Sequence, residues 1–95
     1  MYITINYGED YDVLFLPTDD VDINDLHKQF CDWLYDEKST HTYRVCFEDG
    51  SIGYSYDANA FVEWLNENFF MDQDKAVLVE ENTKNVDVNR PCINF

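Results

Sequence analysis

The sequence predicts an α+β fold in which an antiparallel sheet of five or six strands carries two helices on one face. Paired alternating segments separated by short glycine-containing turns are typical of β-hairpins. Two further segments repeat their apolar residues with the helical period. The predicted order is ββα-ββα-β, with a weak sixth strand at 86–88, in a single domain over residues 1–95.

The first sixteen residues predict a hairpin with its turn at residues 8–10. A three-residue loop there pairs Ile5 with Val13 and places the large side chains on one face. Leu14 and Leu16 are then expected on the opposite face beside Tyr2, where they could serve as apolar anchors for a partner or form a second buried face.

A helix is predicted after Asp22, which has the right chemistry for an N-cap. Leu26, Phe30 and Leu34 recur at helical spacing, and the helix is expected to end near residues 36–38.

The second hairpin is predicted around Asp49-Gly50, a dipeptide that favours a two-residue type I′ turn. That turn pairs Phe47 with Ile52 and again collects the large side chains on one face.

Asp57 is the predicted N-cap of a second helix over about residues 58–70, and residues 76–80 predict a further strand. Residues 30–36 and 61–67 match at five of seven positions, counting Asp and Glu as equivalent. An old duplication of a ββα unit, over 1–38 and 42–70, would explain the match. The simple needs of a short amphipathic helix would explain it too.

The charge balance limits the partners. Twenty acidic residues face six basic ones, which gives a net charge of −14, and the acids are spread along the whole chain. Such a surface should repel nucleic acid and anionic membranes, and attract basic proteins. Three cysteines without CxxC spacing, no basic leader and no long apolar run predict a protein of the reducing cytoplasm.

Catalytic and metal-binding patterns are weak. The sequence has no nucleophile elbow or phosphate-binding glycine loop, and no carboxylate pair stands out, so we expect neither an enzyme nor a cofactor. His27 and Cys31 have metal-ligand spacing but lack further ligands, so no metal site is predicted. Weak surface binding of calcium near Asp72 and Asp74 stays open.

Carboxylates four residues apart on a helix lie about 6 Å apart along its axis, a spacing that resembles neighbouring phosphates on one strand of DNA. A rigid acidic surface of this kind could occupy a basic nucleic-acid channel. We expect the partner to contact the following residues: Asp12, Leu14, Leu16, Asp19, Asp20, Asp32, Asp36, Glu37, Glu63, Glu67, Asp72 and Asp74.

In overall character the chain resembles the small acidic inhibitors that phages make against bacterial defence, including anti-CRISPR proteins and other DNA mimics. Asp32, Asp36, Glu63 and Glu67 carry the resemblance as acids on predicted helix exteriors. It implies an inhibitor, monomer or homodimer, that acts in the host bacterial cytoplasm. The inhibitor would bind a CRISPR effector or nuclease and block nucleic-acid binding or cleavage.

Two other functions fit the same sequence. One is an immunity protein or antitoxin that neutralises a basic nuclease toxin. The other is a structural or assembly protein that dimerises through its sheet.

Overall fold

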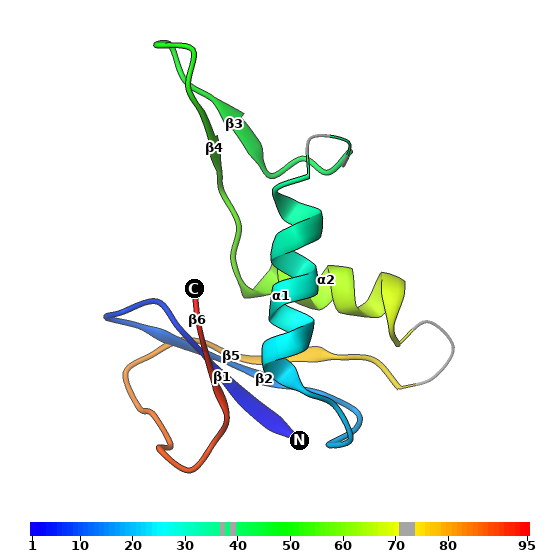
Figure 1. Ribbon diagram of the computed structural model, residues 1–95. Coiled ribbons are helices and arrows are strands. Elements are labelled where there is room, and N and C mark those ends of the chain that lie inside the picture. Colours follow the sequence, from blue (N-terminus) through cyan, green and yellow to red (C-terminus); the bar gives the residue numbers. More distant parts are fainter. Residues whose placement is uncertain (37, 39, 71–73) are drawn as a thin grey trace.

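The computed structural model describes residues 1–36, 38, 40–70 and 74–95, and it confirms the α+β class and the order of the first seven elements (Figure 1). The elements are β1 (Tyr2–Asn6), β2 (Tyr11–Phe15), α1 (Ile23–Leu34), β3 (Arg44–Cys46), β4 (Ile52–Tyr54), α2 (Ala58–Asn68), β5 (Val77–Thr83) and β6 (Cys92–Asn94).

The strands form two sheets, where one sheet of five or six strands was predicted. Four strands pair in the order β5-β2-β1-β6, and β3 pairs with β4 alone. The main sheet is mixed because β6 runs parallel to β1, with Ile5 opposite Ile93. The sixth strand therefore lies at the C-terminus, whereas residues 86–88 contain no strand.

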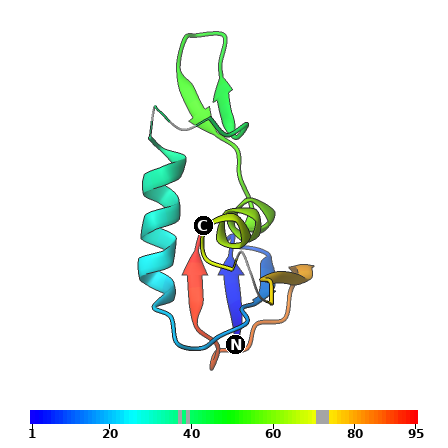
Figure 2. The same ribbon diagram turned by 90° about the vertical axis from the view of Figure 1, so that its right-hand side faces the viewer.

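We call β3, β4 and the turn between them the arm, residues 44–54. The arm projects away from the main sheet and the helices (Figures 1 and 2). The predicted location of this hairpin in a larger common sheet is thus wrong. Near its end the arm exposes Phe47 and Ile52, with 56% and 58% of their surfaces accessible.

The register of the first hairpin differs by one residue from the prediction. Ile3 lies opposite Leu14 and Ile5 opposite Asp12, and the loop has two residues, Gly8 and Glu9, between the bonded Tyr7 and Asp10. Gly8 takes a φ of +100°, a conformation that glycine adopts without a steric penalty. Because Gly8 comes first in the turn, it favours a two-residue loop rather than a three-residue loop.

This shift exchanges the two faces of β2, since side chains alternate along a strand. Leu14 and Leu16 face the helices and are fully buried, so the prediction that they anchor a partner is wrong. Phe15 lies instead on the opposite face, where its ring packs against Tyr2 at a centroid distance of 5.3 Å.

The second hairpin also differs from the prediction by one residue, but here the loop is longer than expected rather than shorter. Val45 lies opposite Gly53, and a three-residue loop of Glu48, Asp49 and Gly50 replaces the expected two-residue turn. The expected turn needs a positive φ at both central residues, but here only Gly50 takes one, at +86°. The arm therefore presents its large side chains on both faces.

Both predicted helix caps are confirmed. The Asp22 side chain accepts hydrogen bonds from the first backbone N–H groups of α1, and Asp57 accepts one from Ala60. Helix α1 ends at Leu34, two residues earlier than expected. In the described part of the chain, no helix has the length and apolarity needed to cross a membrane.

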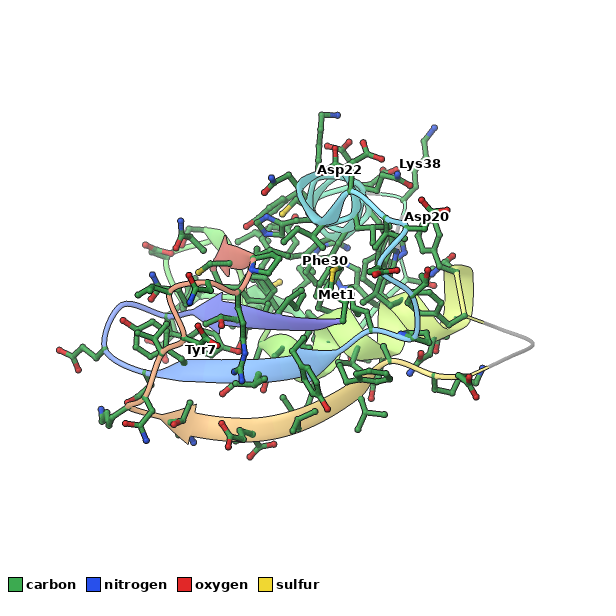
Figure 3. All side chains as sticks on the ribbon, turned by 90° about the horizontal axis from the view of Figure 1, so that it is seen from below. Met1, Tyr7, Asp20, Asp22, Phe30 and Lys38 are labelled. Atoms are coloured by element: carbon green, nitrogen blue, oxygen red, sulfur yellow. The ribbon has the colours of Figure 1, made fainter. Side chains whose placement is uncertain are left out.

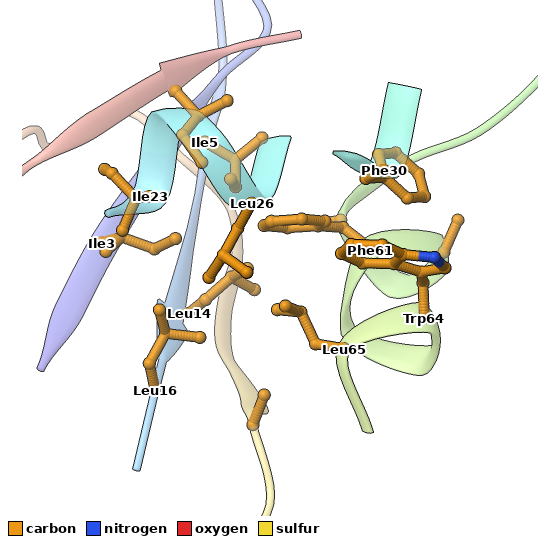
Figure 4. Close-up of a cluster of buried hydrophobic side chains, with 14 of the residues drawn as sticks. Ile3, Ile5, Leu14, Leu16, Ile23, Leu26, Phe30, Phe61, Trp64 and Leu65 are labelled. Atoms are coloured by element: carbon orange, nitrogen blue, oxygen red, sulfur yellow. The ribbon is translucent and has the colours of Figure 1, made fainter. Parts of the chain in front are cut away.

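The core lies between the helices and one face of the main sheet (Figure 4). Phe30 of α1 is fully buried at its centre, and its ring contacts those of Trp33, Phe61 and Trp64 at centroid distances of 6.0, 5.2 and 5.7 Å. The C-terminal Phe95 stacks on it as well. Aromatic contacts of this kind add to the free energy of burial, so Phe30 joins both helices and the chain end.

We predict that Phe30→Ala lowers the free energy of unfolding by about 3–5 kcal/mol, because it leaves a cavity in the core. Phe47→Ala is the matched control and should cost about 1 kcal/mol or less, since Phe47 is exposed. Urea unfolding followed by circular dichroism measures both changes. Equal effects for the two substitutions would contradict the central place of Phe30.

Candidate functional site

A groove of about 270 Å³ lies between the end of α1, residues 40–43 and one side of α2. Four rings and two carboxylates line most of it: Trp33, His41, Tyr43, Trp64, Glu63 and Glu67. Thr40, Thr42 and Ala60 complete the wall. We call this site the groove.

Helix α2 supplies the acidic wall through its periodicity. Phe61 and Leu65 face the core and are fully buried, while Glu63 and Glu67, one turn apart, are exposed. Residues four apart share one side of a helix. The same alternation that builds the core therefore presents two carboxylates at the groove.

His41 attaches the segment before the arm to the end of α1. Its Nε2 lies 2.7 Å from the carbonyl oxygen of Leu34, and its Nδ1 accepts the backbone N–H of Tyr43 at 3.1 Å. Since Nδ1 accepts, Nε2 carries the proton and donates it to Leu34. This bond satisfies a carbonyl in the last turn of α1, which the helix itself leaves unpaired.

Tyr43 links the same segment to α2. Its hydroxyl donates a hydrogen bond of 2.8 Å to Oε2 of Glu63. The pKa of Tyr43 is raised to about 12, first by burial, then by the hydrogen bond to Glu63 and by the charges of Glu63, Asp57 and Glu67. The phenol oxygen thus lies in the negative field of three carboxylates, which opposes a further negative charge there.

A second hollow, of about 250 Å³, has mainly acidic and amide walls but uses its central polar groups internally. The Tyr7 hydroxyl donates to Asp12 at 2.8 Å and accepts the N–H of Ala58 at 2.8 Å. The other Asp12 oxygen accepts the N–H of Asn82 at 2.9 Å. This network joins the first hairpin, the start of α2 and β5, and we interpret it as structural.

The predicted site residues are not brought together as one surface. Asp12 is only 6% exposed, so the prediction that it contacts a partner is wrong; the one-residue register shift turns it inward. Asp19 and Asp20 are exposed in the loop before α1, where Figure 3 labels Asp20, and Asp36 is exposed beyond the end of α1. Asp32 is exposed and pairs with Lys28 at 3.1 Å.

Asp74 is also exposed, whereas Glu37 and Asp72 lie outside the described residues. Glu63 and Glu67 are the predicted residues that share the groove.

Sequence reasoning missed the ring-bearing wall of the groove. None of its four rings, those of Trp33, His41, Tyr43 and Trp64, is among the predicted site residues. The available signal was the segment 40–43, where two ring side chains alternate with polar ones a few residues after a helix. Its approach to α2 depends on contacts between distant residues, which no local pattern shows.

The pair of His27 and Cys31 has a structural explanation. The ring of His27 stacks on that of Phe95 at 5.2 Å and meets Phe61 edge-on, and burial lowers its pKa. Burial also raises the pKa of the Cys31 thiol. Over residues 1–36, 38, 40–70 and 74–95, no three His, Cys, Asp or Glu side chains are placed to hold a metal ion.

Comparisons of the chain with protein-family models, with curated proteins and with solved structures find no significant match.

We predict that Glu63→Gln lowers the pKa of Tyr43 from about 12 toward 10, the ordinary value for tyrosine. Glu67→Gln, the matched control, removes the same charge without the hydrogen bond and should lower it less. Because folding raises this pKa, the contribution of Tyr43 to stability is complete below pH 10 and is lost as the pH rises through about 12.

Carbon-13 NMR of labelled tyrosine rings measures the pKa, and unfolding between pH 9 and 12 follows the stability. An unchanged Tyr43 pKa in Glu63→Gln would contradict the role assigned to this hydrogen bond.

Proposed function

We propose that this protein binds the basic nucleic-acid-binding surface of another protein and thereby competes with nucleic acid. In keeping with its resemblance in character to anti-CRISPR proteins and other DNA mimics, the proposed target is a bacterial defence effector. The observation that carries the proposal is the number of carboxylates that remain exposed to solvent without an internal counter-charge.

Most of the exposed carboxylates among the described residues have no basic side chain of the same protein paired with them. Of the twenty acidic residues, Glu37 and Asp72 lie outside the described chain, which leaves eighteen, and sixteen of these are exposed. Within these described residues, three carboxylates take part in ion pairs, those of Asp10, Asp32 and Asp87. Acids this numerous repel one another, so folding alone gives no reason to display them.

The displayed acids support mimicry of a polynucleotide through their spacing on rigid elements. Glu63 and Glu67 are one helical turn apart on α2, about 6 Å along its axis. Helix α2 packs against the core through Phe61, Trp64 and Leu65, so it holds the carboxylates in place. A preorganised acidic surface loses less conformational entropy on binding than a disordered acidic tail does.

Specific binding also needs apolar anchors, since hot spots at interfaces are commonly apolar or aromatic groups. The buried Leu14 and Leu16 cannot fill this role. Phe47 and Ile52 at the end of the arm replace them in our proposal, because both are more than half exposed. Glu48 and Asp49 lie beside them in the turn, so a matching cleft would be apolar with a basic rim.

Exposed apolar side chains and an edge strand of the main sheet favour a second candidate function, assembly of copies of this chain. Tyr2, Val77 and Val79 are about half exposed, at 51%, 50% and 47%, and β5 forms an edge of the sheet. An exposed edge strand can pair with another chain. Repulsion between two copies of net charge −14 opposes this pairing at low salt.

The two candidates therefore predict opposite effects of salt. Added salt should weaken binding to a basic partner and strengthen self-association, because it screens attraction in the first case and repulsion in the second. Size-exclusion chromatography with light scattering, at low and high salt, measures self-association. A dimer that grows with salt would favour assembly, and a monomer throughout would exclude it.

We predict that the immobilised protein captures basic nucleic-acid-binding proteins from a host lysate at low salt. Salt or added DNA should release them, because carboxylates and phosphates compete for the same Lys and Arg side chains. Mass spectrometry identifies the captured proteins and separates a defence effector from a nuclease toxin, the target of an immunity protein. Capture that is indifferent to both salt and DNA would contradict the proposal.

With the captured partner in hand, reversal of Glu63 and Glu67 to Lys should lower the association rate by about tenfold at low ionic strength. Reversal of Glu9 and Glu80, which are exposed and lie off α2, is the matched control with the same net charge. Stopped-flow mixing measures both rates. If the two reversals slow association equally, α2 is not at the interface.

A further inference from the structure

We propose that the groove receives an arginine side chain of the partner, between its aromatic rings and the carboxylates of Glu63 and Glu67. The inference rests on the proposed function, because it names the chemical group by which a basic partner is recognised. The groove would then recognise one side chain of the basic partner specifically, in addition to the general attraction between opposite charges.

The rings and the carboxylates both favour a cation. Aromatic faces attract cations through the ring quadrupole. Trp33, His41 and Tyr43 form one cluster beside the groove, with ring centroids 4.7 to 6.4 Å apart. The neutral tautomer of His41, defined by its two hydrogen bonds, adds no positive charge to this wall.

The two carboxylates retain acceptor capacity toward the groove. Glu63 uses Oε2 to accept the hydroxyl of Tyr43, which leaves Oε1 available. Glu67 is exposed, and in the described part of the chain its carboxylate has no hydrogen bond or ion pair. A cation in the groove would therefore gain new charge-assisted hydrogen bonds without breaking existing ones.

The size and shape of the site favour arginine. A volume of about 270 Å³ is below the roughly 300–1,000 Å³ of small-molecule sites and suits a single long side chain. A guanidinium is planar, stacks on rings and presents several donors in a fixed fork, whereas the lysine ammonium is a compact, strongly hydrated charge. The carboxylates of Glu63 and Glu67 beside aromatic rings therefore match a guanidinium better than an ammonium.

The arginines of this chain are already engaged, which favours a partner over a second copy. Arg44 donates to the carbonyl of Asp36 at 3.1 Å and lies over the ring of Tyr54. Arg90 lies over the ring of Tyr2 and pairs with Asp87 at 3.8 Å. Filling the groove of another copy would require these contacts to break.

The chain offers a built-in reporter. Its only two tryptophans are Trp33 and Trp64, and both line the groove. Tryptophan fluorescence and the two indole N–H resonances therefore report on this site directly. The probes are hexa-arginine and hexa-lysine peptides, which carry the same charge and differ in the chemistry tested.

We expect hexa-arginine to shift both indole resonances and to bind about two- to fivefold more tightly than hexa-lysine, the range for an exposed cation–π contact. Glu67→Gln should remove most of this preference. Glu80→Gln, the matched control, makes the same change of charge at an exposed residue of β5 and should preserve it.

Equal binding of the two peptides without indole shifts, and equal effects of Glu67→Gln and Glu80→Gln, would overturn the arginine site and leave the electrostatic function standing. No binding of either peptide at low salt would overturn both proposals.

Discussion

The packing of Phe30 is the interaction on which the rest of the structure depends. Its fully buried ring contacts Trp33 on its own helix, Phe61 and Trp64 on α2, and Phe95 at the chain end. Three of these contacts join segments that are far apart in the sequence. Because Trp33 and Trp64 also line the groove, the geometry of the candidate site follows from the packing of the core.

Almost all the described carboxylates of this molecule lie outside its buried core. The apolar core occupies the space between the helices and the sheet, and nearly every described carboxylate lies outside it. Asp12 is the exception, and its oxygens accept hydrogen bonds from Tyr7 and Asn82. Burying a carboxylate is costly unless its acceptors are satisfied, so this network explains how one acid is tolerated inside. Of the other seventeen described acids, sixteen are exposed.

Much of the fold could be predicted because its signals are local. Asp22 and Asp57 cap their helices as expected, since capping needs only the next few backbone N–H groups. The registers of the two hairpins could not be predicted from the alternation alone. In each hairpin two registers differ by one residue, and the place of Gly8 or Gly50 within the turn decides between them. In the first hairpin, the shift of one residue places Leu14 and Leu16 in the core rather than at the surface.

The sequence by itself determined the first seven helices and strands and the strongly acidic character of the protein, because period, caps and composition act over a few residues. Only the tertiary structure decided that the arm leaves the main sheet and that β6 joins β1. It also decided that His41 and Tyr43 meet Glu63 and Glu67 at one groove. These outcomes depend on contacts between residues distant in the chain. Their free energy comes from shared burial, which no local pattern encodes.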